Sequence, residues 1–223
     1  MDIYTNIVTF FQSGGAFMYP ISLVLFFGLA IALERWLFLS SAKLSNSRAF
    51  NKLMPMLKKK DFNGVLNTAQ GSKAPISRII SAGIGRLAQS QRRDEIEYAM
   101  EEGVMETLPR LEKRTQYLAT LANIATLLGL LGTIIGLIAA FTAVANADPA
   151  EKASLLSASI SVAMNTTAFG LITAIPLLFF HAVLQTKTTE IVDSLEMAGV
   201  KVLNILCEKQ VSKSYSRTTD KAA

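Results

Sequence analysis

Residues 118–141 read LATLANIATLLGLLGTIIGLIAAF, without a single Asp, Glu, Lys or Arg. A helix needs about 20 predominantly apolar residues to cross the hydrocarbon core of a bilayer, so this stretch predicts a membrane-spanning helix. Thr126 and Thr133 stand seven positions apart and therefore share one face of that helix. Gly132 and Gly136 form a GxxxG pair, which lets another helix approach closely. We expect this span to pack against helices or to line a narrow polar passage.

The composition points to a membrane protein with several spans. The 223 residues are 51% hydrophobic, with a mean hydropathy of +0.36, which is too apolar for an ordinary soluble domain. One Cys and one His exclude a disulfide framework and a Cys/His metal cluster, so we predict no metal site. No basic residue precedes the first apolar run, so we expect no cleaved signal peptide and a first span that stays in the mature protein.

The distribution of apolar and charged residues predicts an all-α polytopic membrane protein with three transmembrane helices and long helices that extend into the cytoplasm. The expected parts are a periplasmic or interfacial lead-in (1–17), span one (18–39), a cytoplasmic helical domain (40–117), span two (118–144), a periplasmic loop (145–158), span three (159–185) and a cytoplasmic tail (186–223).

Helical segments are also expected between the first two spans. The pattern favours separate helices at Ser45–Leu57, Asp61–Gln70 and Pro75–Gln89. A longer helix is predicted to begin at Asp94, to bend slightly at Pro109 and to continue without interruption into span two.

Charge predicts the orientation in the membrane. Residues 40–117 carry fourteen Lys and Arg and the tail carries six, whereas the lead-in has none and the 145–158 loop has one. Because basic residues collect on the cytoplasmic side, we expect the N-terminus outside and the C-terminus inside.

Span three reads SISVAMNTTAFGLITAIPLLFFHAVLQ and also carries polar residues along one side. Asn165, Thr166 and Thr167 lie in its outer half, and Pro176 is expected to kink it. A small-residue stripe comprises Ala163, Thr167, Gly170 and Ala174, and a neighbouring hydroxyl stripe comprises Ser159, Thr166 and Thr173. We take Thr133, Thr167, Thr166, Asn165 and Thr126 as candidate ion-pathway residues, and Gly129, Gly132, Gly136, Gly170 and Pro176 as candidate helix-packing residues.

A plainer interpretation stays open, because Ser and Thr in membrane helices often bond back to their own carbonyls or join helices. Spans two and three contain no Asp, Glu, Lys or Arg, so any charge needed for conduction must come from a partner. Glu34 and Arg35, near the end of span one, form either an interfacial pair or a packing contact between subunits.

These motifs together resemble the MotA/TolQ/ExbB proton-channel family. The similar features are LGLLGTIIGLIAAF in span two, NTTAFGLITAIPLLFFHAV in span three and the ERW sequence that closes span one. Three spans, rather than four, are typical of an ExbB/TolQ-type subunit.

The resemblance implies a bacterial inner-membrane homopentamer around an ExbD/TolR-like single-span partner whose membrane Asp carries the ion. A TonB- or TolA-like protein would then receive the force, for outer-membrane transport or envelope maintenance. On matching positions, Thr133 and Thr167 would be the pore threonines. Membrane lipids are expected partners, and neither nucleic acid nor a cofactor is expected, the transported ion being H⁺ or Na⁺.

One position departs from the family's pattern. ExbB and TolQ carry a Glu in span three, five residues before the second pore threonine, and Val162 stands there in this sequence. Asn165 and Thr166 add oxygen atoms at positions that are usually apolar, and hard cations prefer oxygen ligands. Either Na⁺ is therefore the driving ion, or proton transfer depends wholly on the partner's Asp.

Two other classes of function compete with ion conduction. A non-conducting membrane scaffold of an envelope assembly is the alternative, although the facing hydroxyl stripes weigh against it. An intramembrane enzyme is disfavoured, and no catalytic residue is predicted, because the sequence offers no acid pair, Ser/His arrangement or metal-ligand cluster.

Overall fold

The computed structural model describes residues 2–145 and 147–219, and within them it contains helices and no strand. This confirms the all-α prediction, and three helical segments are long and apolar enough to cross a membrane. The helices are α1 (Asp2–Ser13), α2 (Met18–Lys58), α3 (Phe62–Gln70), α4 (Pro75–Gln89), α5 (Arg93–Glu112), α6 (Thr115–Ala145) and α7 (Lys152–Thr219).

The chain divides into two compact units. The first, here called the membrane unit, comprises the described residues up to Arg35 together with Arg114–Leu184. The second comprises Trp36–Lys113 and the described residues from Gln185 onward, and it is here called the cytoplasmic unit because the sequence predicts that side of the membrane for it. Helices α2 and α7 each contribute residues to both units.

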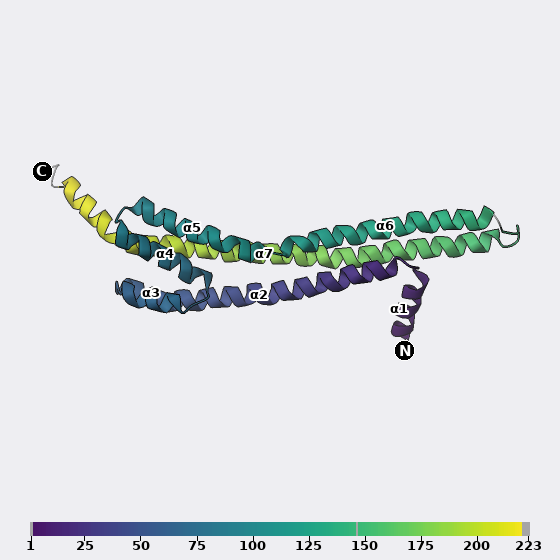
Figure 1. The fold of residues 1–223 in the computed structure, drawn as a ribbon, viewed down its shortest axis with the longest axis horizontal. Coiled ribbons are helices and arrows are strands. Elements are labelled where there is room, and N and C mark those ends of the chain that lie inside the picture. Colours follow the sequence, from purple (N-terminus) through teal and green to yellow (C-terminus); the bar gives the residue numbers. More distant parts are fainter. Residues whose placement is uncertain (1, 146, 220–223) are drawn as a thin grey trace. The chain divides into compact units, whose positions relative to one another are not determined.

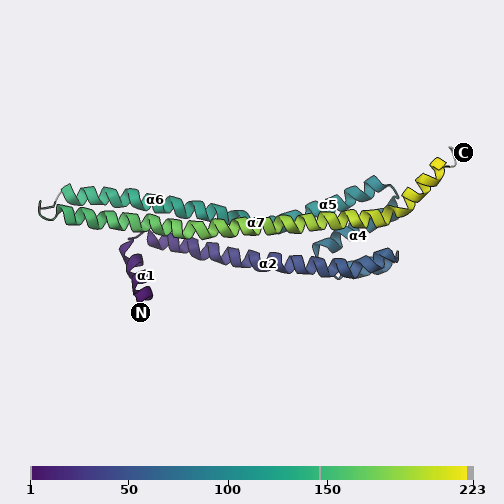
Figure 2. The same ribbon diagram turned by 180° about the vertical axis from the view of Figure 1, so that it is seen from behind.

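In the membrane unit, α6 and the first part of α7 run side by side in opposite directions (Figures 1 and 2). They meet through residues with little or no side chain, because a Cβ on Gly129 would lie 3.3 Å from the Cα atoms of both Gly170 and Thr167. A Cβ on Gly136 would lie 2.8 Å from the Cβ of Ala163. The glycines of span two therefore allow α7 of the same chain to approach closely.

Large apolar side chains cover the outside of the membrane unit. Phe26 is 68% exposed, Leu127 63%, Phe141 64% and Phe179 64%. Because α2, α6 and α7 present these residues over the length of the spans, this surface suits contact with lipid or with other transmembrane helices. The protein is thus a multi-pass membrane protein.

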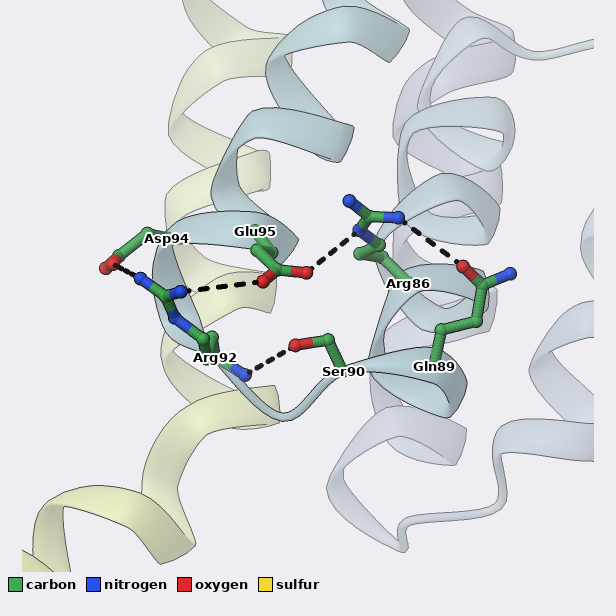
Figure 3. Close-up of polar contacts among 6 residues, drawn as sticks. All are labelled: Arg86, Gln89, Ser90, Arg92, Asp94 and Glu95. Atoms are coloured by element: carbon green, nitrogen blue, oxygen red, sulfur yellow. Dashed lines mark hydrogen bonds and ion pairs between the residues drawn. The ribbon is translucent and has the colours of Figure 1, made fainter.

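In the cytoplasmic unit, α4 and α5 form a hairpin, and α3 packs on α4. The turn between α4 and α5 is closed by polar contacts (Figure 3): Arg86 Nε lies 3.4 Å from Glu95 Oε2, and Arg92 Nη1 lies 3.9 Å from Glu95 Oε1. Close helix contact is again made through a glycine, since a Cβ on Gly103 would lie 3.2 Å from the Cα of Ile79.

Two predicted helix boundaries are wrong. Met18–Lys58 is one continuous helix, α2, so no break separates span one from the helix expected at Ser45–Leu57. The helix expected to begin at Asp94 does not run into span two, because α5 ends at Glu112 and α6 begins at Thr115.

The break between α5 and α6 coincides with an unusual backbone conformation. Arg114 adopts a left-handed backbone conformation with φ of 69°, which cannot continue an α-helix. Its guanidinium Nη1 lies 3.4 Å from Glu34 Oε2 on α2. The sequence has no glycine at this point, and glycine is the usual signal for such a conformation.

Candidate functional site

Two candidate ion-pathway residues, Thr133 on α6 and Thr167 on α7, meet where these helices pack together, at a place here called the α6–α7 crossing. The Thr167 hydroxyl on α7 lies 2.8 Å from the Gly129 carbonyl oxygen and 3.3 Å from Thr133 Oγ1, both on α6. Because a hydroxyl has one proton, Thr167 can donate to only one of these oxygens at a time. Thr133 in turn donates to the Leu130 carbonyl at 2.6 Å. Two helices thereby place two hydroxyl and two carbonyl oxygens close together.

The glycines explain why these hydroxyls can touch. Gly129 and Gly170 face each other, so the backbones of α6 and α7 approach closely next to Thr167. A Cβ on Gly170 would lie 2.8 Å from the Ala125 carbonyl oxygen, so a larger residue would separate the helices. Thr133 and Thr167 remain half-buried, which leaves part of each accessible from outside the pair.

The other candidate ion-pathway residues do not join the Thr133–Thr167 pair. Thr166 is 2% exposed, and its hydroxyl lies 2.6 Å from the Gly14 carbonyl and 2.9 Å from that of Val162. Asn165 Nδ2 donates to Ser13 Oγ at 3.1 Å. Thr126 bonds back to the Ala122 carbonyl at 3.1 Å. Their roles in an ion pathway stay predictions.

Sequence reasoning missed the part played by the turn after α1. Ser13 and Gly14 are more than 150 positions from Asn165 and Thr166, yet they are their hydrogen-bond partners. Phe169 of α7 also packs edge-on against Phe11, with ring centroids 6.0 Å apart. The pair Gly14-Gly15 was the only signal of a turn here, and nothing in it indicated which helix the turn contacts.

Among the other residues that the sequence singled out, Thr173 and Gly132 are buried and Pro176 is half-buried. Thr173 is fully buried, and among the described residues its hydroxyl has no hydrogen-bond partner. Gly132 faces the Thr166 side chain on α7 and Phe17 in the turn before α2, so its neighbours belong to its own chain. Pro176 lies inside α7 and is half-buried.

Glu34 and Arg35 are neighbours in the sequence but differ in how exposed their side chains are. Glu34 forms the ion pair with Arg114 described above and is exposed, whereas the Arg35 side chain is 3% exposed. Glu34 therefore links α2 to the start of α6. The interfacial role expected for the two residues stays a prediction.

No group of His, Cys, Asp and Glu within the described residues could hold a metal ion. The oxygens at the α6–α7 crossing are of a different kind, being hydroxyls and carbonyls. Neutral oxygens of this type accept hydrogen bonds and can also contact a hard cation. The crossing can therefore orient an ionisable group or a partly dehydrated ion that reaches it.

Known proteins share this sequence pattern. A model of the MotA/TolQ/ExbB proton channel family matches residues 71–197, which include spans two and three. A protein of Methanothermobacter thermautotrophicus, whose name describes it as an ExbB homolog in biopolymer transport, is 28% identical over 219 residues, covering 95% of this chain and 76% of its own. A Synechocystis protein named as ExbB-like 3, also for biopolymer transport, is 27% identical over 176 residues, covering 78% of this chain and 83% of its own.

The family match covers more than half of the chain and contains both residues of the Thr133–Thr167 pair. The three apolar helical segments agree with the three-span arrangement that the sequence predicted. This chain belongs to the MotA/TolQ/ExbB proton channel family.

Proposed function

We propose that this protein is the ion-channel subunit of an inner-membrane energy-transducing complex, in which the flow of H⁺ or Na⁺ drives a partner that reaches the periplasm. The observation that carries the proposal is the hydrogen-bonded pair Thr133–Thr167, whose hydroxyls meet inside two spans that lack Asp, Glu, Lys and Arg. Hydroxyls in such a place can solvate an ion or a protonated carboxyl while avoiding the cost of a fixed charge in the membrane.

The absence of charge from spans two and three makes a partner necessary. We propose an ExbD/TolR-like protein with a single span, whose membrane Asp binds and releases the ion beside Thr133 and Thr167. The half-buried state of both threonines leaves them accessible to such a helix. Several copies of this chain, five by analogy with the family, would surround it. A TonB- or TolA-like protein would transmit the force to outer-membrane transport or envelope maintenance.

Two ions fit this arrangement. Family membership favours H⁺, carried by the partner's Asp. The four oxygens of the crossing, together with Val162 in place of a carboxylate, support Na⁺ as the second candidate, because hard cations are held by oxygen ligands.

Ion flux decides between these candidates. The complex with its partner is reconstituted into liposomes, and H⁺ and Na⁺ gradients are imposed separately. Flux under a Na⁺ gradient that is lost in Thr167→Ala identifies a sodium-driven protein. Flux of H⁺ alone places the ion chemistry on the partner's Asp, with Thr133 and Thr167 as its hydrogen-bonding surroundings.

Substitution of the threonines tests the proposal itself. Thr133→Val and Thr167→Val keep the side-chain shape but remove the hydroxyls, so we expect flux to be abolished while the complex still assembles. Thr142→Val is the matched control, because Thr142 is exposed on the same helix and donates to the Ile138 carbonyl at 2.9 Å. Normal flux in both Thr133→Val and Thr167→Val would contradict the proposal.

A non-conducting scaffold is the alternative function. The close approach of Gly129 to Gly170 favours it, because small residues are also used simply to pack helices together. This alternative predicts no ion flux in the intact complex. It also predicts that Thr133→Val and Thr167→Val leave envelope function normal.

A further inference from the structure

The cytoplasmic unit contains a cavity of about 510 Å³ with a strongly basic lining. Arg48 and Lys52 of α2 and Lys73 of the α3–α4 connection provide three positive charges, and none of the lining residues is acidic. Within the described residues none of these three side chains takes part in an ion pair. Three unneutralised cations around one cavity attract an anion.

Hydroxyl groups complete the lining. Ser41, Ser45, Thr68, Ser72 and Ser77 all border the cavity. Ser72 Oγ accepts a hydrogen bond from the Ala74 amide at 3.2 Å, so its own proton remains available to a ligand. The cavity therefore offers hydrogen-bond donors of two kinds, charged and neutral.

Ser77 gives independent support for a ligand. Its side chain is 1% exposed, and its hydroxyl has no hydrogen-bond partner among the described residues although it borders the cavity. An unsatisfied buried hydroxyl costs about 1–3 kcal/mol. Ser77 also lies in the first turn of α4, where the partial positive charge of the helix dipole favours an anion.

The cavity begins near the expected membrane surface. Span one is predicted to end at residue 39, and α2 continues unbroken through the cavity-lining residues. At about 1.5 Å of rise per residue, Ser41 lies about 3 Å and Ser45 about 9 Å beyond that end. Phospholipid headgroups occupy this depth, whereas Arg48 and Lys52 reach further into the aqueous side.

We propose that this cavity binds a phosphate group, presented either by an anionic phospholipid headgroup or by a soluble phosphate. Arg48, Lys52 and Lys73 neutralise its charge, and Ser72 and Ser77 donate hydrogen bonds to its oxygens. Arg78, which borders an adjacent cavity with Lys73, is not part of the site because its guanidinium is already paired with Glu106 at 3.1 Å. The site is independent of ion conduction.

The test measures thermal unfolding of the purified full chain in detergent micelles. Inorganic phosphate is compared with chloride at equal ionic strength, and micelles containing phosphatidic acid are compared with micelles containing phosphatidylcholine. A rise in Tm with phosphatidic acid alone identifies a lipid headgroup, and a rise with inorganic phosphate identifies a soluble ligand. The proposal is overturned if neither raises the Tm.

The triple variant R48Q/K52Q/K73Q should bind about tenfold or more weakly than the wild type, because it loses charged hydrogen bonds. The triple variant K58Q/K59Q/K60Q is the matched control, since it removes three positive charges from residues that do not line the cavity. Equal weakening in both variants would show a general effect of charge and would overturn the site.

Ser77→Ala separates a ligand contact from a structural one. We expect the variant without ligand to unfold at the same or a higher temperature, because an unsatisfied buried hydroxyl is removed, and its Tm rise with the effective ligand to be smaller. A lower Tm without ligand, or an unchanged ligand effect, would contradict the role given to Ser77.

Discussion

Thr166 and Thr167 are adjacent in sequence, but their hydroxyls point to different partners. Thr167 contacts Gly129 and Thr133 across the α6–α7 crossing, whereas Thr166 contacts Gly14 in the turn after α1. Consecutive residues of a helix point about 100° apart, so two neighbouring threonines cannot share one polar face. Thr167 is therefore the member of this pair that the geometry joins to Thr133.

Lys60 has a left-handed backbone conformation, which residues other than glycine rarely adopt. Its φ is 60°, its amide donates to the Leu57 carbonyl at 2.9 Å, and the Asp61 amide donates to the Met56 carbonyl at 3.1 Å. These two bonds end α2 in the manner that normally places glycine at the left-handed position. The exposed Lys side chain thus occupies a conformation that costs a non-glycine residue about 1–2 kcal/mol.

Lys60→Gly should consequently stabilise the protein by up to about 1 kcal/mol, since the relief of strain exceeds the extra chain entropy of glycine. Thermal unfolding in detergent measures the effect. Lys59→Gly is the control at an exposed position without a positive φ, and we expect it to give no gain. A loss of stability in Lys60→Gly would contradict this account.

At the scale of elements, the contact of α6 with α7 leaves no room for a side chain at position 170. The Cβ of an alanine at position 170 would lie 2.8 Å from a backbone oxygen of α6, and backbone atoms of a packed helix cannot easily move away. The position of Gly85 on α4 is the opposite case, because no heavy atom lies within 4 Å of an added Cβ.

Gly170→Ala should therefore lower the free energy of unfolding by about 1–3 kcal/mol, as overpacking does. Gly85→Ala should raise it by up to about 1 kcal/mol through helix propensity alone. Both variants replace a helical glycine by alanine, and thermal unfolding of the two compares them directly. If Gly170→Ala were as harmless as Gly85→Ala, the close approach of α6 and α7 would be refuted.

Helices α2 and α7 are also joined within the cytoplasmic unit. Lys43 Nζ lies 2.9 Å from Glu190 Oε2, and this hydrogen bond, with the charge of Lys43, lowers the pKa of the Glu190 carboxyl below its ordinary value. A carboxyl whose pKa is lower in the folded state stabilises the protein at pH values above its unfolded-state pKa. This stabilisation is lost as the pH falls through the folded-state pKa.

Glu190→Gln should consequently destabilise the protein slightly at neutral pH, and the difference from the wild type should disappear in acid. The effect is small because both side chains are more than half exposed and solvent screens the pair. Unfolding measured between pH 7 and pH 3 tests the trend, and Lys43→Gln in the Glu190→Gln background should add nothing. A difference that grows in acid would have the wrong sign.

At the scale of the whole molecule, the orientation in the membrane can be tested with the chain's own chemistry. Cys207 is the only cysteine; it is buried, and burial raises the pKa of its thiol, so it reacts slowly with maleimides. Cysteines placed at the exposed positions Ser154 and Lys59 can then be compared in a Cys207→Ala background.

With the N-terminus outside, Ser154→Cys should react with a membrane-impermeant maleimide added to intact cells. Lys59→Cys should react only after the cells are permeabilised. Labelling is read from the mass shift of the purified protein, and the Cys207→Ala background alone should remain unlabelled. The reverse pattern would contradict the orientation that the basic residues predict.

The amino-acid sequence alone was enough to predict the class of fold and the three spans. The spans were readable because hydrophobic length is a local property of the chain. Thr133 and Thr167 were singled out as pore threonines by the resemblance to the family, and the contact between their hydroxyl oxygens, 3.3 Å apart, was seen only in the structure.

Contacts between residues that lie far apart in sequence became visible only in the packed helices. The contact of Thr166 with Gly14, the break at Arg114 and the basic cavity around Ser77 all depend on how helices pack. Local pattern could not reveal them, because each feature joins residues that lie far apart in sequence. A signal such as Gly14-Gly15 indicates a turn but not which helix that turn will contact. The hydrophobic pattern determines that a helix forms, and packing determines where it ends and what its polar atoms contact.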